Sequence, residues 1–483
     1  MPTPSLSRDI LRLAVPALGA LVAEPLFLLT DTALVGHLGE VPLAALGIAS
    51  ALIQTVIGLL VFLAYATTPA VARLLGAGDR PGALRAGIDG LWLALLLGAV
   101  VVLLGLAFSA NAVGLFTSDP AVATDATTYL TVSLAGLPAM LLVIAATGVL
   151  RGLQNTRTPL VVAVCGFAAN AGLNALFIYR GSWGPGWPEL GFGWGIAGSA
   201  AGTVVAQWAM ALIYLLIVVR AARASGASLR PGLSGVGSAA ASGGWLFVRT
   251  ASLRAAMLAT VAVAATFGVA ELGAFQIALT LFATLAFVLD ALAIAAQALV
   301  GHGLGSGDVQ RVRFLLRRLI VWSLGVGTVL GAAVALLAPV LGPVFSASPE
   351  VQHGVTVTAL AMAAGIPLAG FVFVLDGVLI GAGDARYLAL SGLVNLALYA
   401  PLLLLVLWLH PAAAADGGST ASDPVAHAAG AVTTPTGGLA DSHALVWLWA
   451  AFGYGYIGAR ALTLGLRART PHWMRLGPTP TPA

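Results

Sequence analysis

Two acidic residues lie in an apolar stretch near the start of the chain. The run Pro16–Gly39 is long enough to cross a bilayer, yet it contains Glu24 and Asp31. Their spacing is close to two helical turns, so both carboxyl groups project from nearly the same face of a helix. A carboxyl group at membrane depth is costly and normally faces a protein interior or a watery cavity. These two residues are therefore the first candidates for a functional site.

Asp31 is the stronger candidate for reversible binding of a proton or a metal cation. An apolar setting favours the neutral carboxyl group over the charged one, so protonation can become a physiological event. Pro16 and Pro25 remove backbone donors in the same stretch and predict a hinge in the helix. Protonation of Asp31 would then bias that helix between two shapes. The alternative is a buried acid that hydroxyl or amide groups merely satisfy. Glu24 is either a partner of Asp31 or a bystander.

Asn170 and Asn174 are candidate neighbours of this acid. They are four residues apart in a later apolar run, so they share one helix face. Their amides can hydrogen-bond a carboxyl group or offer an oxygen to a cation. The alternative is that they only hold neighbouring helices together.

The second half of the chain has its own intramembrane charges, Arg249, Arg254, Asp290 and Asp376. Pairing an arginine with an acid would lower the cost of burying both. The sequence leaves open which residues pair, and whether a pair is structural or takes part in coupling.

The elements that must position these residues are membrane-spanning helices. The 483 residues are 59% hydrophobic and only 8% charged, with a mean hydropathy of +0.99, which excludes an ordinary soluble protein. Lipid offers no partners to backbone polar groups, so we predict an all-α polytopic membrane protein. Apolar runs of about 20 residues predict twelve spans. They are Ile10–Gly36, Pro42–Arg73, Ala86–Ala110, Thr124–Arg151, Pro159–Tyr179, Trp194–Arg220, Gly244–Phe267, Leu272–Leu299, Phe314–Leu341, Gln352–Ile380, Tyr387–Leu409 and Ala444–Leu466.

The distribution of arginines predicts the orientation. With twelve spans, nearly all loop arginines fall on one side, whereas the opposite loops hold Arg180 and several acids. The positive-inside rule then places both termini in the cytoplasm of a multi-pass plasma-membrane protein. The low-complexity segment 411–442 falls on the outer side, and we interpret it as a disordered external loop.

The two halves of the chain repeat each other at a constant offset of 229 positions, as from Gly76 to Gly305. Pro138 likewise falls on Pro367 and Gly152 on Gly381. Because each repeat holds six spans, we expect two six-helix lobes related by a pseudo-two-fold axis along the membrane normal. We assign residues 1–222 to the first lobe, 223–243 to a cytoplasmic linker and 244–483 to the second lobe. The acids are not repeated, since Asp31 corresponds to Thr260 and Asp376 to Thr147.

Several motifs together resemble the multidrug and toxic compound extrusion (MATE) transporters of the MOP superfamily, most closely their DNA-damage-inducible-F-like branch. They are Pro16 with Asp31 fifteen residues later, VGHLG, LAALGIA, GAGD, LRGLQNTRTP and LDGVLIGAGDAR. The resemblance implies export of amphipathic or cationic organic compounds in exchange for H⁺ or Na⁺. It also implies that Pro16 and Asp31 undergo a protonation-linked bend, and it matches Asp376 to a coupling acid of other branches. Many relatives have Asn-x-x-x-Asp where this chain has Asn170 and Asn174, which weakens the expectation of Na⁺.

We therefore expect a proton-coupled antiporter for small molecules, with ion coupling at Asp31, Asn170, Asn174 and Glu24. We expect no cofactor, no metal site, no nucleic-acid partner and no catalysis, and a monomer in the bilayer. The alternatives are a Na⁺-coupled exporter, a flippase for a lipid-linked intermediate, or a membrane enzyme. A flippase would favour several cavity arginines, and we count only Arg249 and Arg254 within the spans. An enzyme of the prenyl-transferase kind would need clustered acids for Mg²⁺, whereas these acids lie on different spans.

Overall fold

The computed structural model describes residues 4–180, 191–410 and 437–478, and every regular element in these ranges is helical. The first half contains α1 (Pro4–Gly36), α2 (Glu40–Leu60), α3 (Phe62–Gly76), α4 (Arg80–Gly114), α5 (Pro120–Leu134), α6 (Leu137–Gly152), α7 (Arg157–Ile178) and α8 (Gly195–Ala224). The second half contains α9 (Leu233–Ala264), α10 (Val269–Gly305), α11 (Val309–Phe345), α12 (Pro349–Gly381), α13 (Ala385–Leu409), α14 (Gly437–Ala450), a π-helical turn (Ala451–Tyr456) and α15 (Ile457–Arg469).

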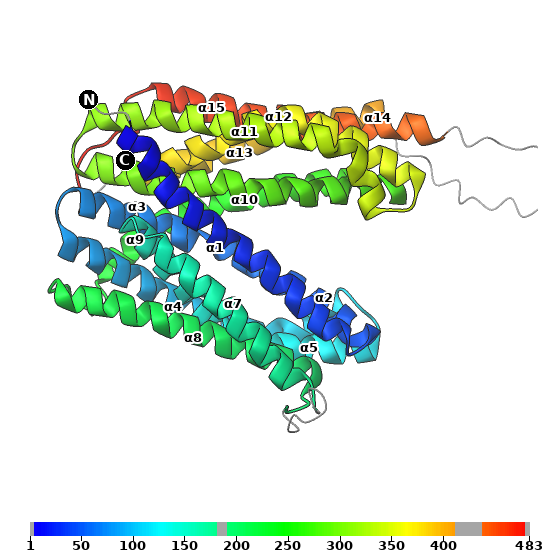
Figure 1. Ribbon diagram of the computed structural model, residues 1–483, viewed down its shortest axis with the longest axis horizontal. Coiled ribbons are helices and arrows are strands. Elements are labelled where there is room, and N and C mark those ends of the chain that lie inside the picture. Colours follow the sequence, from blue (N-terminus) through cyan, green and yellow to red (C-terminus); the bar gives the residue numbers. More distant parts are fainter. Residues whose placement is uncertain (1–3, 181–190, 411–436, 479–483) are drawn as a thin grey trace, which may run out of the picture.

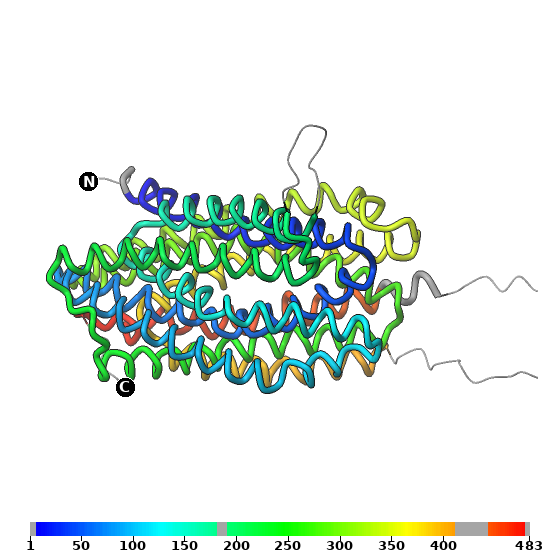
Figure 2. The backbone as a smooth tube through the Cα atoms, turned by 90° about the horizontal axis from the view of Figure 1, so that it is seen from below, coloured from blue at the N-terminus to red at the C-terminus, as the bar shows by residue number. Residues whose placement is uncertain are grey.

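The helices form two lobes of six membrane-crossing rods each. Figure 1 shows α10 to α15 in one group and most of α2 to α8 in the other, with α1 running obliquely from the first group to the second. Both termini lie at the same end of the bundle, where the two groups converge. Seen from a perpendicular direction, the rods run side by side along the long axis (Figure 2). This arrangement confirms the predicted all-helical, two-lobe fold.

Twelve rods account for the described helices. Ten helices are long and apolar enough to span a membrane, with α2 and α3 together counted as one, and the bent pair α5 and α6 supplies an eleventh. The twelfth rod is α14 with α15, which the π-helical turn interrupts. Large apolar side chains remain exposed along the rods, such as Leu103, Leu336 and Trp408. Their exposure fits a surface that faces lipid.

Two first-lobe spans that the sequence predicts as single helices are broken. The span predicted as Pro42–Arg73 is divided at Val61, and the span predicted as Thr124–Arg151 bends by 50° between α5 and α6. Their repeats in the second lobe, α10 and α12, are continuous. A Gly-x-Pro motif occurs at the bend, at Gly136 and Pro138, and also in unbroken α12, at Gly365 and Pro367. The motif alone therefore does not bend the helix.

Close glycine contacts show the repeat in three dimensions. A side chain at Gly98 would meet Pro138, and one at its counterpart Gly327 would meet Pro367. The aspartates that cap α4 and α11 also correspond, because Asp79 accepts from Gly82 N at 2.8 Å and Asp308 accepts from Arg311 N at 2.9 Å. The shared sequence positions therefore build the same packing in both lobes.

The lobes meet through a symmetric pair of such contacts. A Cβ atom added to Gly76 of α3 would lie 2.1 Å from the carbonyl oxygen of His302 in α10. A Cβ atom added to Gly305 of α10 would lie 2.0 Å from the carbonyl oxygen of Arg73 in α3. Because the offset of 229 positions exchanges these two contacts, the lobes are related by a pseudo-two-fold axis, as a self-complementary interface requires. Buried Arg73 strengthens the contact by donating to the carbonyl oxygen of Ala382 at 3.1 Å.

The segment between the lobes is partly helical. We predict a linker over 223–243, but α8 ends at Ala224 and α9 begins at Leu233, so only eight residues separate the helices. Gly232 N donates to Asp89 of α4 at 2.8 Å, and Trp92 of α4 donates to the carbonyl oxygen of Leu229 at 3.1 Å. These bonds hold the segment against the first lobe.

The predicted external loop lies mostly outside the described residues. Of the segment 411–442, residues 411–436 are not described, and α14 begins at Gly437, within the predicted loop.

The glycine contacts between the lobes give a first prediction. Gly76→Ala and Gly305→Ala each place a methyl group against a backbone carbonyl that cannot rotate away, so each is expected to lower the unfolding free energy by about 1–3 kcal/mol. Gly47→Ala is the control, because this helical glycine has nothing within 4 Å of its Cβ position. Thermal unfolding in detergent measures the difference. Equal melting temperatures for all three variants would contradict the proposed packing.

Candidate functional site

Asp31 lies in a sealed polar cluster where four helices of the first lobe meet. Its side chain is only 2% exposed, although it sits within a long apolar helix. Asn174 of α7 donates to Oδ1 at 2.8 Å, Tyr129 of α5 donates to Oδ2 at 3.0 Å, and Ser199 of α8 also donates to Oδ1. None of the ion pairs in the described part of the chain involves Asp31. The groups that donate hydrogen bonds to the Asp31 carboxylate are therefore all uncharged.

This set of donors suits both charge states of the carboxyl group. An ionised carboxylate accepts from all three neighbours, as the geometry shows. A protonated carboxyl group would need an acceptor for its own proton, and a hydroxyl group can supply one by rotating. Tyr129 and Ser199 carry such hydroxyl groups, whereas the amide NH₂ of Asn174 can only donate. The cluster can therefore take up a proton on Asp31 without leaving a buried polar group unpaired.

Asn170 extends the cluster by one more turn of α7. It donates to Thr203 of α8 at 3.0 Å and exchanges weaker contacts of 3.3 and 3.4 Å with Asn174. Both asparagines are at most 1% exposed. Gly202 of α8 permits this approach, because a Cβ atom there would lie 2.1 Å from Asn174 Oδ1. The structure thus brings together Asp31, Asn170 and Asn174, as the sequence predicts.

Glu24 does not join this cluster. Its side chain is exposed, and no hydrogen bond or ion pair of Glu24 is found among the described residues. Seven helical residues also correspond to a rise of about 10 Å, so two carboxyl groups on one face of α1 are still well separated. Glu24 stays a prediction as a coupling residue.

The prolines leave α1 unbroken. The helix continues from Pro4 to Gly36 with both Pro16 and Pro25 inside it. Pro16 cannot donate to the carbonyl oxygen of Arg12, one turn earlier, and Thr156 at the start of α7 approaches that oxygen at 3.5 Å instead. The helix is therefore continuous at both prolines in this conformation, and the hinge stays a prediction.

Helix α1 touches both lobes. Near its start, Ser7 accepts two hydrogen bonds from Arg318 of α11, at 3.0 and 3.1 Å, and Ala17 packs against α10. It also packs against α7, from Arg12 beside Thr156 to Gly19 beside Leu160, and Asp31 near its end joins the cluster of α5, α7 and α8. Pro16 therefore lies in the stretch of α1 that contacts both lobes.

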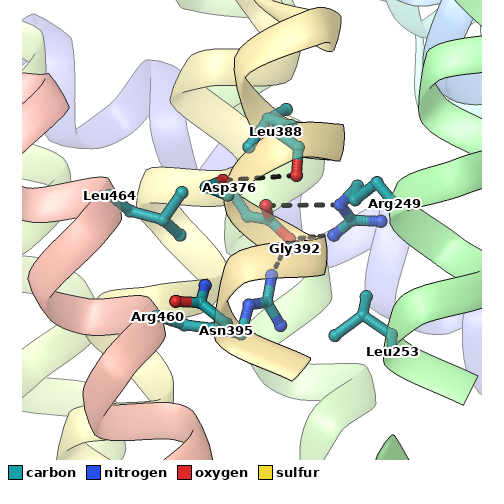
Figure 3. A pocket seen from close by; sticks show the side chains of 9 residues that line it. Arg249, Leu253, Asp376, Leu388, Gly392, Asn395, Arg460 and Leu464 are labelled. Atoms are coloured by element: carbon teal, nitrogen blue, oxygen red, sulfur yellow. Dashed lines mark hydrogen bonds and ion pairs between the residues drawn. The ribbon is translucent and has the colours of Figure 1, made fainter. Parts of the chain in front are cut away.

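The second lobe holds a charged cluster in which two arginines share one carboxylate. Asp376 of α12 accepts from Arg249 of α9 through both carboxylate oxygens, and Nη2 of Arg460 in α15 donates to its Oδ2 at 2.8 Å. Figure 3 shows the two guanidinium groups converging on this carboxylate from separate helices. The residues around them are Leu253, Leu388, Ser391, Gly392, Asn395 and Leu464.

The remaining charges of the second lobe have different surroundings. Asp290 of α10 forms none of the ion pairs in the described residues but interacts electrostatically with Arg151 of α6 and with Arg249. Arg254 reaches toward α2, where its Nη2 atom lies 2.8 Å from the Cβ position of Gly58. Of the candidate pairs that the sequence left open, the structure forms only Arg249 with Asp376.

Sequence reasoning missed Arg460, which binds the carboxylate of Asp376. Counting only Arg249 and Arg254 as intramembrane arginines is wrong, because Arg151 ends one predicted span and Arg460 lies within another, and both are buried. The predicted span Ala444–Leu466 contains Arg460, so the signal was present. Tyr129 and Ser199 were also missed, because nothing in their local sequence points toward Asp31.

A known protein family matches both halves of the chain. The MatE family profile matches residues 16–176 and 246–405, which is one block in each lobe. Protein DETOXIFICATION 44, chloroplastic, from Arabidopsis thaliana is 29% identical over 396 residues, covering 79% of this chain and 73% of that protein. DNA damage-inducible protein F from Escherichia coli K12 is 28% identical over 421 residues, covering 84% of this chain and 87% of that protein.

Solved structures share the fold. A Vibrio cholerae MATE transporter, VcmN in its bent form, has a TM-score of 0.78 at 20% identity, covering 97% of this chain and 98% of that one. A MOP superfamily transporter from Pyrococcus furiosus, described as having a binding pocket of reverse polarity, has a TM-score of 0.78 at 20% identity and covers 96% of each chain. At these identities the likeness shows the fold alone.

The shared carboxylate of Asp376 generates a stability prediction. Asp376→Ala leaves two buried guanidinium groups without their partner, so the unfolding free energy is expected to fall by about 3–5 kcal/mol. Asp384→Ala is the matched control, because Asp384 pairs with Arg467 at 2.8 Å and both side chains are more exposed. That variant is expected to lose about 0–1 kcal/mol. Thermal unfolding in detergent compares them, and similar losses for both variants would show that the Asp376 cluster is not specially stabilising.

Proposed function

This chain belongs to the MatE family of membrane transporters, and on that premise we propose that it is a secondary antiporter that exports small amphipathic organic compounds in exchange for protons. Members of this family transport small molecules across membranes, so we also propose that the chain is not an enzyme. The observation that supports proton coupling is the Asp31 cluster. There a 2% exposed carboxyl group has three neutral donors and takes part in none of the ion pairs of the described residues.

Helix α1 is the element through which protonation of Asp31 would affect transport. Protonation of Asp31 removes a negative charge from the end of α1 that packs in the first lobe, while its beginning is bonded to the second lobe. A change of charge at one end of this helix can therefore alter how the two lobes fit together. Pro16, in the stretch of α1 that contacts both lobes, is the proposed hinge, with Pro25 as a second weak point.

Na⁺ coupling is the nearest alternative. A sodium ion prefers several oxygen ligands, and here Asn174 turns its NH₂ group toward Asp31. That orientation supports proton coupling. Flipping of a lipid-linked intermediate is the second alternative. Buried Arg460 and Arg151, in addition to Arg249 and Arg254, weaken the objection that intramembrane arginines are too few.

We further propose that the protein is a monomer in the plasma membrane with both termini in the cytoplasm. The common end of both termini in Figure 1 supports a single side, and the loop arginines support the cytoplasmic side. For the lobes we propose boundaries at 1–222 and 244–483.

Proton coupling is tested by Asp31→Asn in proteoliposomes loaded with a fluorescent amphipathic dye. The wild type is expected to release dye when a proton gradient is imposed, and Asp31→Asn is expected to lose the gradient-driven part, at least about tenfold, because it cannot take up the proton. Asp125→Asn is the control, since this acid lies one turn from Tyr129 on α5 and makes no described hydrogen bond. Gradient-driven release that persists in Asp31→Asn would refute the proposal, and Glu24→Gln measured alongside decides the role of Glu24.

The identity of the coupling ion is tested by Asn174→Asp. This change places a second carboxylate beside Asp31, and a cation between two carboxylates relieves their repulsion. The wild type is expected to transport at equal rates in Na⁺ and K⁺, whereas Asn174→Asp is expected to become dependent on Na⁺. Faster wild-type transport in Na⁺ would instead favour the sodium-coupled alternative.

A further inference from the structure

The second-lobe cluster has more positive than negative charge. Arg249 and Arg460 both donate to the single carboxylate of Asp376. Arg151 and Asp290, which interact electrostatically with each other, add one charge of each sign. Among the described residues of this region, three arginines thus stand against two aspartates. One guanidinium charge has no protein carboxylate of its own.

An uncompensated guanidinium at membrane depth calls for an anion. Charged side chains are tolerated there when they pair with each other or face a water-filled space that brings them a partner. In the ion pair of Arg467 with Asp384, found among the described residues, one arginine meets one aspartate. The Asp376 cluster departs from that one-to-one ratio, so it has the charge to hold a second anionic group.

The cluster is also more accessible than the Asp31 site. Arg460 is 9% exposed and Asp376 is 5% exposed, whereas Asp31 is 2% exposed and Asn170 and Asn174 are at most 1% exposed. The pocket around it combines apolar walls from Leu253, Leu388 and Leu464 with the polar groups of Ser391 and Asn395. This lining is typical of sites for small amphipathic ligands, but its side chains are closely packed in this conformation and must move apart to admit one.

The cluster adjoins the contact between the lobes. The guanidinium group of Arg249 lies over the ring of Tyr65 in α3, 5.6 Å from its centre. Five residues further along α9, Arg254 approaches α2. A ligand held by Arg249 would therefore lie where motion of one lobe against the other changes access.

We propose that Arg249 and Arg460 form the binding subsite for an oxyanion group, a carboxylate or a phosphate, of the transported compound. Two guanidinium groups offer paired N–H donors that match the two oxygens of such a group. Asp376 accepts from the same donors, so it competes with the ligand for them. The inference rests on the proposed transport function and narrows its substrates to amphipathic organic anions.

The test compares two probes that differ in charge but share one apolar body, 4-tert-butylbenzoate and 4-tert-butylbenzylammonium. Calorimetric titration of the full chain in nanodiscs of phosphatidylcholine is expected to show benzoate binding at least about tenfold tighter than ammonium binding. Equal affinities, tighter ammonium binding, or binding of neither probe would overturn the inference.

Variants assign the binding to the cluster. Arg249→Gln and Arg460→Gln are each expected to weaken benzoate binding by about tenfold or more, and Arg249→Lys by less, because lysine keeps the charge but loses the paired donors. Asp376→Asn, which removes the competitor and keeps the shape, is expected to tighten it by about tenfold. Arg467→Gln, the control, should bind as the wild type does. Unchanged affinity in Arg249→Gln and Arg460→Gln would overturn the assignment.

Two further experiments ask whether the oxyanion comes from a lipid or from a free small molecule, and whether a negative result contradicts the anion subsite alone or the antiporter as well. Phosphatidylglycerol added to the nanodiscs will compete with benzoate if a lipid phosphate occupies the same subsite, and will leave the titration unchanged if the ligand is a free small molecule. Proton-driven transport of each probe is then measured in proteoliposomes. Transport of the ammonium probe alone would refute the anion subsite but leave the antiporter intact, whereas proton-driven movement of neither probe would count against both proposals.

Discussion

The structure depends on one constraint, which is that polar groups inside a bilayer must find their partners within the protein. Asp31 meets this constraint with three neutral donors and Asp376 meets it with two guanidinium groups. The same need makes every membrane-crossing element helical and brings Arg73 at the lobe contact to a carbonyl group of the opposite lobe. The two solutions for the acids differ in chemistry. Neutral hydroxyl donors allow the carboxyl group of Asp31 to gain or lose a proton. Two guanidinium donors favour the ionised carboxylate of Asp376, and their combined charge exceeds its single negative charge.

The repeat explains how one scaffold carries two different sites. Glycine contacts are duplicated between the lobes, so the backbones pack alike. At the position equivalent to Asp31 the second lobe has Thr260, whose hydroxyl group lies 2.6 Å from that of Tyr399, the counterpart of Asn170. Rings of Phe452 and Tyr456 pack on Tyr399 there. An uncharged aromatic cluster thus fills, in the second lobe, the place that the first lobe uses for its ionisable acid.

The separation of these sites fits the division of labour that we propose. A sealed cluster in one lobe suits a proton, which needs no room, and a cluster beside the lobe contact, where motion of the lobes can open space, suits a larger ligand. Helix α1 links the sealed cluster to the second lobe, because its first turns are bonded to α11 and its last turns carry Asp31. The π-helical turn Ala451–Tyr456 precedes the turn of α15 that holds Arg460. Irregular helical turns of this kind frequently occur at functional sites.

The sequence by itself determined the fold class, the twelve spans, the repeat and the shared helix face of Asn170 and Asn174. Hydropathy, helical spacing and a constant offset are local or periodic signals, and they can be read without knowing which helices touch. Only the tertiary structure decided that Arg249 and Arg460 share Asp376, that Tyr129 and Ser199 complete the Asp31 cluster, and that Glu24 lies apart from it. It also decided that two first-lobe spans break where their second-lobe counterparts do not. The physical reason is the same in each case, since hydrogen bonds between helices and the bending of a helix depend on neighbours that are distant in the chain.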